Sequence, residues 1–184
     1  MMATNNQINI INGILANQPG NLNFLSPLGF RFTLRRSPTV NFFATDANIP
    51  SFELGYATVP SPFSNIHIPG DKPQWGSFRL TFKVDEDFVN YFEIYNWMLK
   101  LGFPNNFGQY AAIASAAPGT GQGTVSDGTL TILNSSMHPN VEVIFRDMFP
   151  VSISDTNFTT TDTTVDYVTA TVEFKYTYLT FNKL

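Results

Sequence analysis

Apolar and polar residues alternate along several stretches of this chain, which is the pattern of half-buried β-strands. The alternation runs through residues 29–36, 77–84, 128–135, 140–148 and, most regularly, 165–181. Side chains that alternate with a period of two lie on opposite faces of a sheet, so each strand has one apolar face. At about 3.3 Å per residue the last stretch would span more than about 50 Å, beyond the usual strand length of a small domain. We therefore expect it either to bend across two sheets or to extend beyond the subunit.

One stretch has helical spacing. After the strand that ends at Val84 the apolar period changes from two to 3.6 residues, which predicts a helix over about 86–101. Asp85 has the chemistry and the position of an N-cap, with Glu86 and Asp87 in the first turn. One face of this helix carries Phe88, Phe92, Tyr95 and Leu99. We expect that face to pack against the sheet as core.

The segments between these elements predict hairpins and loops. Residues 40–46 are predicted to form a strand that pairs with 29–36 in a hairpin. The proline-rich span 49–70 predicts short edge strands and bends, with a turn at 69–71. The glycine-rich residues 105–128 predict a long loop.

The chain divides into an arm and a domain. Residues 1–24 are rich in Asn and Gln, which predicts a segment that is flexible or ordered only by a partner. Residues 25–184 are expected to form a single domain, long enough for a core. The predicted fold is mainly β, an antiparallel β-sandwich or partly open barrel with one flanking α-helix. We expect 1–24 and 105–128 to become ordered only in an assembly.

Composition changes this picture by indicating a partner. Only 13% of the residues are charged and 15% are aromatic, whereas soluble domains average about 25% charged residues. Part of the surface is therefore expected to meet another subunit, the alternative being a stable Asn- and Thr-rich monomer. The net charge of −4 argues against tight nucleic-acid binding, and the lack of cysteine excludes disulfides and thiolate chemistry. Without a signal-peptide pattern or an apolar run of about 18 residues, we expect an intracellular, soluble chain with no membrane anchor.

Candidate chemistry is sparse. Asp85, Glu86 and Asp87 are adjacent and do not converge on one point, so capping of the helix explains them better than acid/base catalysis or magnesium binding. His67 and His138 lack the spacing of zinc ligands. We expect no catalytic, cofactor-binding or metal-binding residues, no cofactor, and no enzymatic activity.

Basic residues gather on two predicted strands. Arg31, Arg35 and Arg36 lie on the predicted strand 29–36, and Arg79 and Lys83 lie on the strand at 77–84. If the two strands were neighbours, these residues would form one basic face for an anion or nucleic acid. The other interpretation, which the negative net charge favours, is a set of solvated strand faces or salt bridges to neighbouring subunits.

Several short stretches resemble a known family. The residues concerned are Gly70, Asp71, Trp75, Leu80, Phe82 and Asp85, then "RDMFPVSIS" at 146–154 and "VDYVTATVEFKY" at 165–176. In these stretches and in its order of elements over about 25–181, the chain resembles the tail tube proteins of contractile-tailed, T4-like bacteriophages. The resemblance implies hexameric rings that stack into the inner tail tube, with tail sheath and baseplate proteins as partners.

The resemblance also implies a location and a cargo. The protein would be assembled in the host cytoplasm and carried in the virion tail, where double-stranded DNA passes through the channel without specific binding during genome ejection. Six residues would then lie at subunit interfaces or in the channel: Arg31, Arg35, Arg79, Lys83, Glu173 and Lys175.

Two alternatives stay open at this point. The first is a baseplate or tail-end protein of the same fold that forms a single ring. The second is a carbohydrate-binding β-sandwich module that uses Trp75, Trp97 and exposed tyrosines as stacking platforms.

Overall fold

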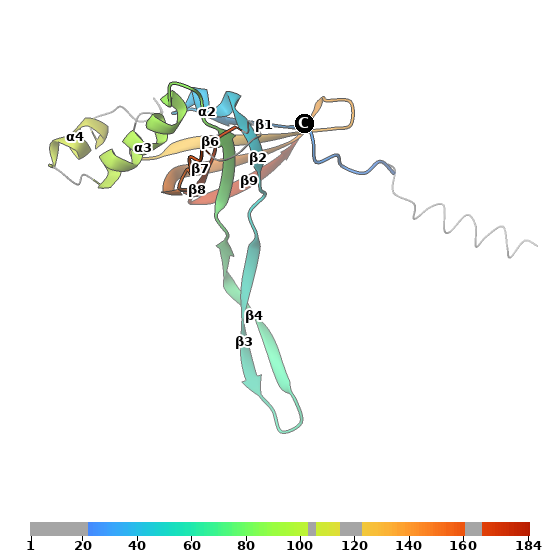
Figure 1. The fold of residues 1–184 in the computed structure, drawn as a ribbon. Helices are drawn as coiled ribbons and strands as arrows, with labels where there is room; N and C mark the ends of the chain where they lie inside the picture. Colours follow the sequence, from blue (N-terminus) through green and yellow to red (C-terminus); the bar gives the residue numbers. More distant parts are fainter. Residues whose placement is uncertain (1–21, 103–105, 115–122, 161–166) are drawn as a thin grey trace, which may run out of the picture.

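Strands dominate the structure, a computed structural model that describes residues 22–102, 106–114, 123–160 and 167–184 (Figure 1). In chain order the elements are β1 (Phe30–Leu34), α2 (Pro38–Phe42), β2 (Ala44–Ala47), β3 (Phe52–Pro60), β4 (Asn65–Trp75), β5 (Phe78–Lys83), α3 (Val89–Gly102), α4 (Gly108–Ala114), β6 (Ser126–Leu133), β7 (Pro139–Ile153), β8 (Thr169–Lys175) and β9 (Tyr178–Lys183). Strands β3 and β4 form a separate hairpin, and the other strands form an antiparallel sheet in the order β1-β6-β7-β8-β5-β2, with β9 also paired to β7. The predicted mainly β, antiparallel fold is confirmed.

The sheet folds into two layers, and β7 runs through both of them. The successive strands β8 and β9 run alongside β7, one in each layer. Val141–Arg146 of β7 pair with β9, and Phe149–Ile153 pair with β8, so β8 and β9 follow one another along the same edge of β7. Strands β6 and β1 continue the layer that contains β9, while β5 and β2 continue the layer that contains β8. The C-terminal stretch therefore bends across two sheets, which is one of the two arrangements that were expected.

The bend has a backbone cause in β7. Asp147 has a φ of 54°, in the left-handed region that a residue other than glycine adopts at a local cost. The side chain of Asp127 stabilises this conformation, because its Oδ2 lies 2.6 Å from Arg146 Nη1 and its Oδ1 accepts a hydrogen bond from the Asp147 amide. On the partner strand the amide of Thr177 donates to the Arg146 carbonyl, which closes the ladder at the bend.

Aromatic rings form the core between the two layers. Phe78 of β5 packs against Phe32 of β1 at a centroid distance of 5.0 Å and against Phe145 of β7 at 4.6 Å. All three side chains are buried. Because β1 and β5 belong to opposite layers, the ring of Phe78 joins the two layers directly. Trp97 and Ile94 of α3 are also buried against this core.

The predicted hairpin of residues 29–36 and 40–46 is wrong. Pro38 begins the short helix α2, and β2 pairs with β5 instead of β1. Asn41 explains the difference, because its side chain accepts a hydrogen bond from the Leu34 amide and donates one to the Leu34 carbonyl. The side chain of Asn41 thus takes the place of a neighbouring strand at the end of β1. Helices α2 and α4 also exceed the single helix that was expected.

Over 49–70 the expected edge strands are confirmed, whereas the expectation of short strands and bends is wrong. Strands β3 and β4 form a long antiparallel hairpin that pairs Phe52 with Trp75 and Pro60 with Asn65. The predicted turn at 69–71 lies inside β4, while the chain reverses between β3 and β4. Both strands of an isolated hairpin have a free edge, where a proline removes no ladder hydrogen bond, so prolines are tolerated there.

A buried phenol in the body leads to a test of stability against pH. The Oη of Tyr176 is buried and has no hydrogen-bond partner among the described residues, and the ring packs edge-on against Phe145. Burial raises the pKa of Tyr176 to about 12, because the phenolate would lose its hydration. In the unfolded chain a tyrosine ionises near its ordinary pKa of about 10. The unfolded state therefore binds fewer protons between about pH 10 and 12, and the free energy of unfolding falls as pH rises through that range.

We expect Tyr176→Phe to remove the part of the loss of stability at alkaline pH that the ionisation of Tyr176 causes. At pH 7 the variant should be as stable as the natural chain or up to about 1 kcal/mol more stable, because it lacks the unpaired buried hydroxyl. The gap between the two chains should widen in favour of the variant at pH 11. Urea denaturation at both pH values measures this, and a variant less stable than the natural chain at pH 7 would contradict the expectation.

Candidate assembly surfaces

The β3–β4 hairpin projects from the body of the molecule (Figure 1). At its base the Gly76 amide donates a hydrogen bond to the Ser51 carbonyl at 2.9 Å, which joins the two strands, and Phe52 packs on Trp75 at a centroid distance of 4.5 Å. Farther out, Gly70 lies so close to the Gly55 carbonyl that a Cβ would meet its oxygen at 2.6 Å. A side chain at position 70 would therefore force the two strands apart there.

Large apolar side chains are exposed along the whole hairpin. They are Phe52, Leu54, Tyr56, Val59, Phe63, Ile66 and Ile68. Directly paired residues share a face of the hairpin. The pair Val59–Ile66 lies on one face and the pair Tyr56–Pro69 on the other, so both faces carry apolar residues. Phe63, in the turn, is 99% exposed. Two-stranded hairpins are marginally stable alone, and exposed apolar surface of this extent marks an interaction site.

Helix α3 begins later than predicted. It spans Val89–Gly102, so Asp85 is not at the predicted N-cap position, although its Oδ1 accepts a hydrogen bond from the Val89 amide at 2.8 Å. Glu86 and Asp87 precede the helix and are not in its first turn. The buried Asn90 donates to the Lys83 carbonyl at 2.8 Å, which fixes the rotation of the helix on β5.

The face of α3 that was expected to form core is mostly exposed. Ile94 and Trp97 are buried, together with Asn90, whereas Phe92 and Tyr95 are 51% and 43% exposed. Leu99 is half-buried. The helix carries two apolar stripes, and the structure buries the stripe of Ile94 and Trp97, not the more aromatic one.

The exposed stripe is part of a larger apolar surface, here called the aromatic surface. It consists of Phe88, Val89, Tyr91, Phe92, Tyr95 and Phe158, of which Phe88 and Tyr91 are half-buried. The Phe88 ring lies 6.0 to 6.2 Å from the rings of Tyr91, Phe92 and Phe158. Phe88 has a φ of 59°, a strained conformation that costs on the order of 1–3 kcal/mol for such a residue. The surface is thus held together around a strained aromatic residue.

The structure separates the predicted basic residues. Arg31 lies on β1, an end strand of the sheet order, and Arg35 directly follows this strand. Arg79 and Lys83 lie on β5, with β6, β7 and β8 between the two strands. The two strands are not neighbours, so the single basic face is wrong. Arg36 is half-buried beside α3 and belongs to neither face.

Acidic and basic residues alternate on the outer face of β5 and β8. Arg79 is directly opposite Glu173, and Lys175 follows on the same face of β8. A hydrogen bond from Ser77 is the main cause that lowers the pKa of Glu173, and the charges of Arg79 and Lys175 lower it further. Glu173 therefore stays ionised at neutral pH and compensates the cations around it.

Strands β1 and β9 leave edges of the sheet open. In the described part of the chain β1 pairs only with β6, and β9 pairs only with β7. The Leu184 amide donates to the Asn140 carbonyl of β7. Since strand amides alternate in direction, the amide of Phe181 points away from β7. Such an edge is a template for another strand.

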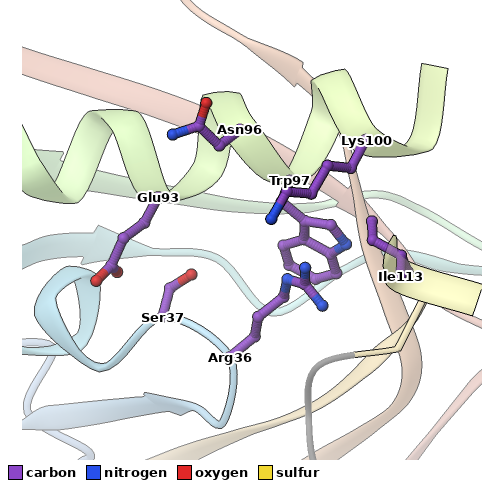
Figure 2. Close-up of a pocket in the computed structure, with 7 residues that line it drawn as sticks. All are labelled: Arg36, Ser37, Glu93, Asn96, Trp97, Lys100 and Ile113. Atoms are coloured by element: carbon purple, nitrogen blue, oxygen red, sulfur yellow. The ribbon is translucent and has the colours of Figure 1, made fainter. Parts of the chain in front are cut away.

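A cavity of about 350 Å³ lies between α3, α4 and the end of β1 (Figure 2). It is lined by Arg36, Ser37, Glu93, Asn96, Trp97, Lys100 and Ile113. The Arg36 guanidinium lies 4.8 Å from the Trp97 ring centroid and donates to the Gly123 carbonyl at 2.6 Å. Burial lowers the pKa of Arg36 from its high ordinary value. Glu93 accepts a hydrogen bond from Thr39. These contacts fasten the β1–α2 connection to α3, which is a structural role.

Other candidate groups do not converge. Within the described ranges no group of three or more His, Asp or Glu side chains is placed to hold a metal ion, and His67 on β4 is remote in the fold from His138 before β7. Trp97 is buried, so it cannot serve as a stacking platform for a sugar. Among the described residues no helix has the length and apolar character needed to cross a membrane.

The fold is shared with components of contractile injection systems. No family model and no curated protein matches the chain. A chain of the tube-terminating cap of the anti-feeding prophage superposes with a TM-score of 0.59 and 14% identity, over 93% of this chain and 99% of that one. A chain of the sheath-tube complex of the extracellular contractile injection system PVC superposes with a TM-score of 0.54 and 12% identity over the whole of both chains. A chain of the anti-feeding prophage baseplate superposes with a TM-score of 0.56 and 12% identity, over 88% of this chain and 97% of that one. The chain therefore has a tail-tube-like fold.

Proposed function

We propose that this protein is a structural, non-enzymatic subunit of the inner tube of a contractile particle, such as a contractile bacteriophage tail or a related injection system. Copies form hexameric rings, and the rings stack around a channel inside a sheath. The observation that carries the proposal is the combination of a tail-tube-like fold with a projecting hairpin that is apolar on both faces. A monomer gains nothing from such a hairpin, whereas a stacked subunit buries it.

Ring closure follows from the open strand edges. Strand β1 of one copy pairs with β9 of the next, which continues the antiparallel alternation β1-β6-β7-β9 into the neighbouring copy. Such a contact joins different patches of the two copies. A rotation of a sixth of a turn between neighbouring copies closes them into a ring of six. The hairpin then reaches the next ring along the axis.

Charge on the sheet faces supports the predicted location of six residues. The outward-facing strand positions include Arg31, Arg79, Lys83, Glu173 and Lys175, and the exposed Arg35 directly follows β1. We place them at subunit contacts or along the channel, where Glu173 offsets part of the positive charge of Arg79 and Lys175. Double-stranded DNA passes through the channel without specific binding, which the net charge of −4 of the whole chain favours.

A ring at a tube end or in a baseplate is the second candidate. It is favoured by the likeness to chains of the anti-feeding prophage cap and baseplate. A single ring and a tube use the same ring contact, and they differ in whether the hairpin finds a further ring.

We expect Phe181→Pro to prevent ring closure while the monomer stays folded. The substitution removes an amide that points away from β7, so it leaves the β7–β9 ladder intact and removes a donor from the open edge. Phe181→Ala is the matched control, because it removes the exposed ring and keeps the amide. Native mass spectrometry should show hexamers for the control and monomers for the proline variant; equal hexamer content in both would contradict closure through β9.

A further inference from the structure

Residues 22–28, here called the apolar arm, carry a second set of exposed apolar side chains. Leu22, Phe24, Leu25 and Leu28 are 63%, 95%, 58% and 83% exposed. The arm contains no charged residue. It joins β1 at Gly29, whose carbonyl accepts a hydrogen bond from the Leu133 amide at the end of β6.

The arm and the aromatic surface lie at opposite ends of the molecule. Figure 1 shows the arm leaving on one side of the body and α3 on the other. The order along β1 agrees, because Gly29 precedes the strand, whereas Arg36, just after it, contacts Trp97 of α3. The five residues of β1 separate the two ends by about 16 Å.

The arm of a chain cannot cover the aromatic surface of the same chain with all of its apolar residues. Leu28 is adjacent to Gly29, so it stays near the start of β1 whatever path the arm follows. Phe24, five residues before Gly29, would need the full extension of the chain to pass the length of β1. The aromatic surface of the same chain therefore cannot cover Leu28 and Phe24 together.

We infer that the apolar arm of one copy docks on the aromatic surface of a neighbouring copy. The inference rests on the proposed function, and it names a contact that neither the sheet edges nor the hairpin makes. Both surfaces are uncharged at their centres, and aromatic side chains dominate such contacts. A contact between opposite ends of the molecule is head-to-tail, so it repeats from copy to copy. The strained Phe88 at the centre of the aromatic surface has a function in this arrangement, because it presents the rings around it.

The absence of cysteine from the sequence permits a direct test. Chains that carry only Phe24→Cys are mixed with chains that carry only Phe92→Cys, assembled, and oxidised. A disulfide between the two kinds of chain is necessarily intermolecular. We expect this heterodimer on non-reducing gels, and not with Thr169→Cys, an exposed site on β8, in place of Phe92→Cys.

Failure of this inference is distinguishable from failure of the proposed function. Rings or tubes in the micrograph of the same sample without the heterodimer would overturn the docking alone. A heterodimer in an assembly that is neither ring nor tube would uphold the docking and contradict the tube. A disulfide of Phe92→Cys with Phe63→Cys, and none with Phe24→Cys, would assign the aromatic surface to the hairpin and overturn the inference.

Discussion

Deleting residues 56–69 should abolish the stacking of rings and leave the folded body unchanged. The deletion joins Gly55 to Gly70, which already lie against each other across the hairpin, and a Gly-Gly pair is a suitable tight turn. The residues removed include Tyr56, Phe63 and Ile68, which are exposed and form no part of the core. We expect the free energy of unfolding to change by less than about 1 kcal/mol.

Electron microscopy and sedimentation of the truncated chain measure the effect. Single rings without tubes are expected, because the sheet edges are intact and the contact to the next ring is lost. Phe63→Ser is a milder companion variant, since it changes one side chain in the turn that is 99% exposed. Tubes of normal length from the truncated chain would show that the hairpin is dispensable for stacking.

Phe78→Ala should have the largest effect on the monomer. The Phe78 ring is fully buried and contacts Phe32, Phe145 and Phe174, so its loss opens a cavity between the two layers. Substitutions of this kind cost about 3–5 kcal/mol, a large part of the about 5–15 kcal/mol that stabilises a domain.

Denaturation by urea, followed by circular dichroism, measures this loss. Phe158→Ala is the control, because that ring is 70% exposed and should change the free energy of unfolding by no more than about 0.5 kcal/mol. A Phe78→Ala chain as stable as the Phe158→Ala chain would contradict the position of Phe78 as the link between the layers.

Alternation of apolar residues predicted most of the sheet. It located β5, β6 and the first part of β7. The excessive length of the C-terminal alternation predicted either a bend or an extension beyond the subunit, and the structure has the bend between β8 and β9. The position of the bend was not predictable, because it depends on the left-handed Asp147 and on its contact with Asp127 on a different strand. Such a contact appears only once β6 and β7 are paired.

The error about the exposed stripe of α3 has a physical reason. The prediction that Phe92 and Tyr95 belong to the core assumes that one monomer buries its own apolar residues. A subunit of an assembly divides its apolar residues between its own core and its neighbours, so hydrophobic character alone does not tell which stripe of α3 is core. The buried Asn90, bound to the Lys83 carbonyl, decides the rotation of the helix.

Negative-stain electron microscopy of the purified natural chain over a range of concentrations tests the central claim most directly. Hollow rings with six-fold symmetry, joined into tubes at higher concentration, are the predicted result. Particles no larger than a 20.5 kDa monomer at every concentration would contradict the account of this chain as a tube subunit.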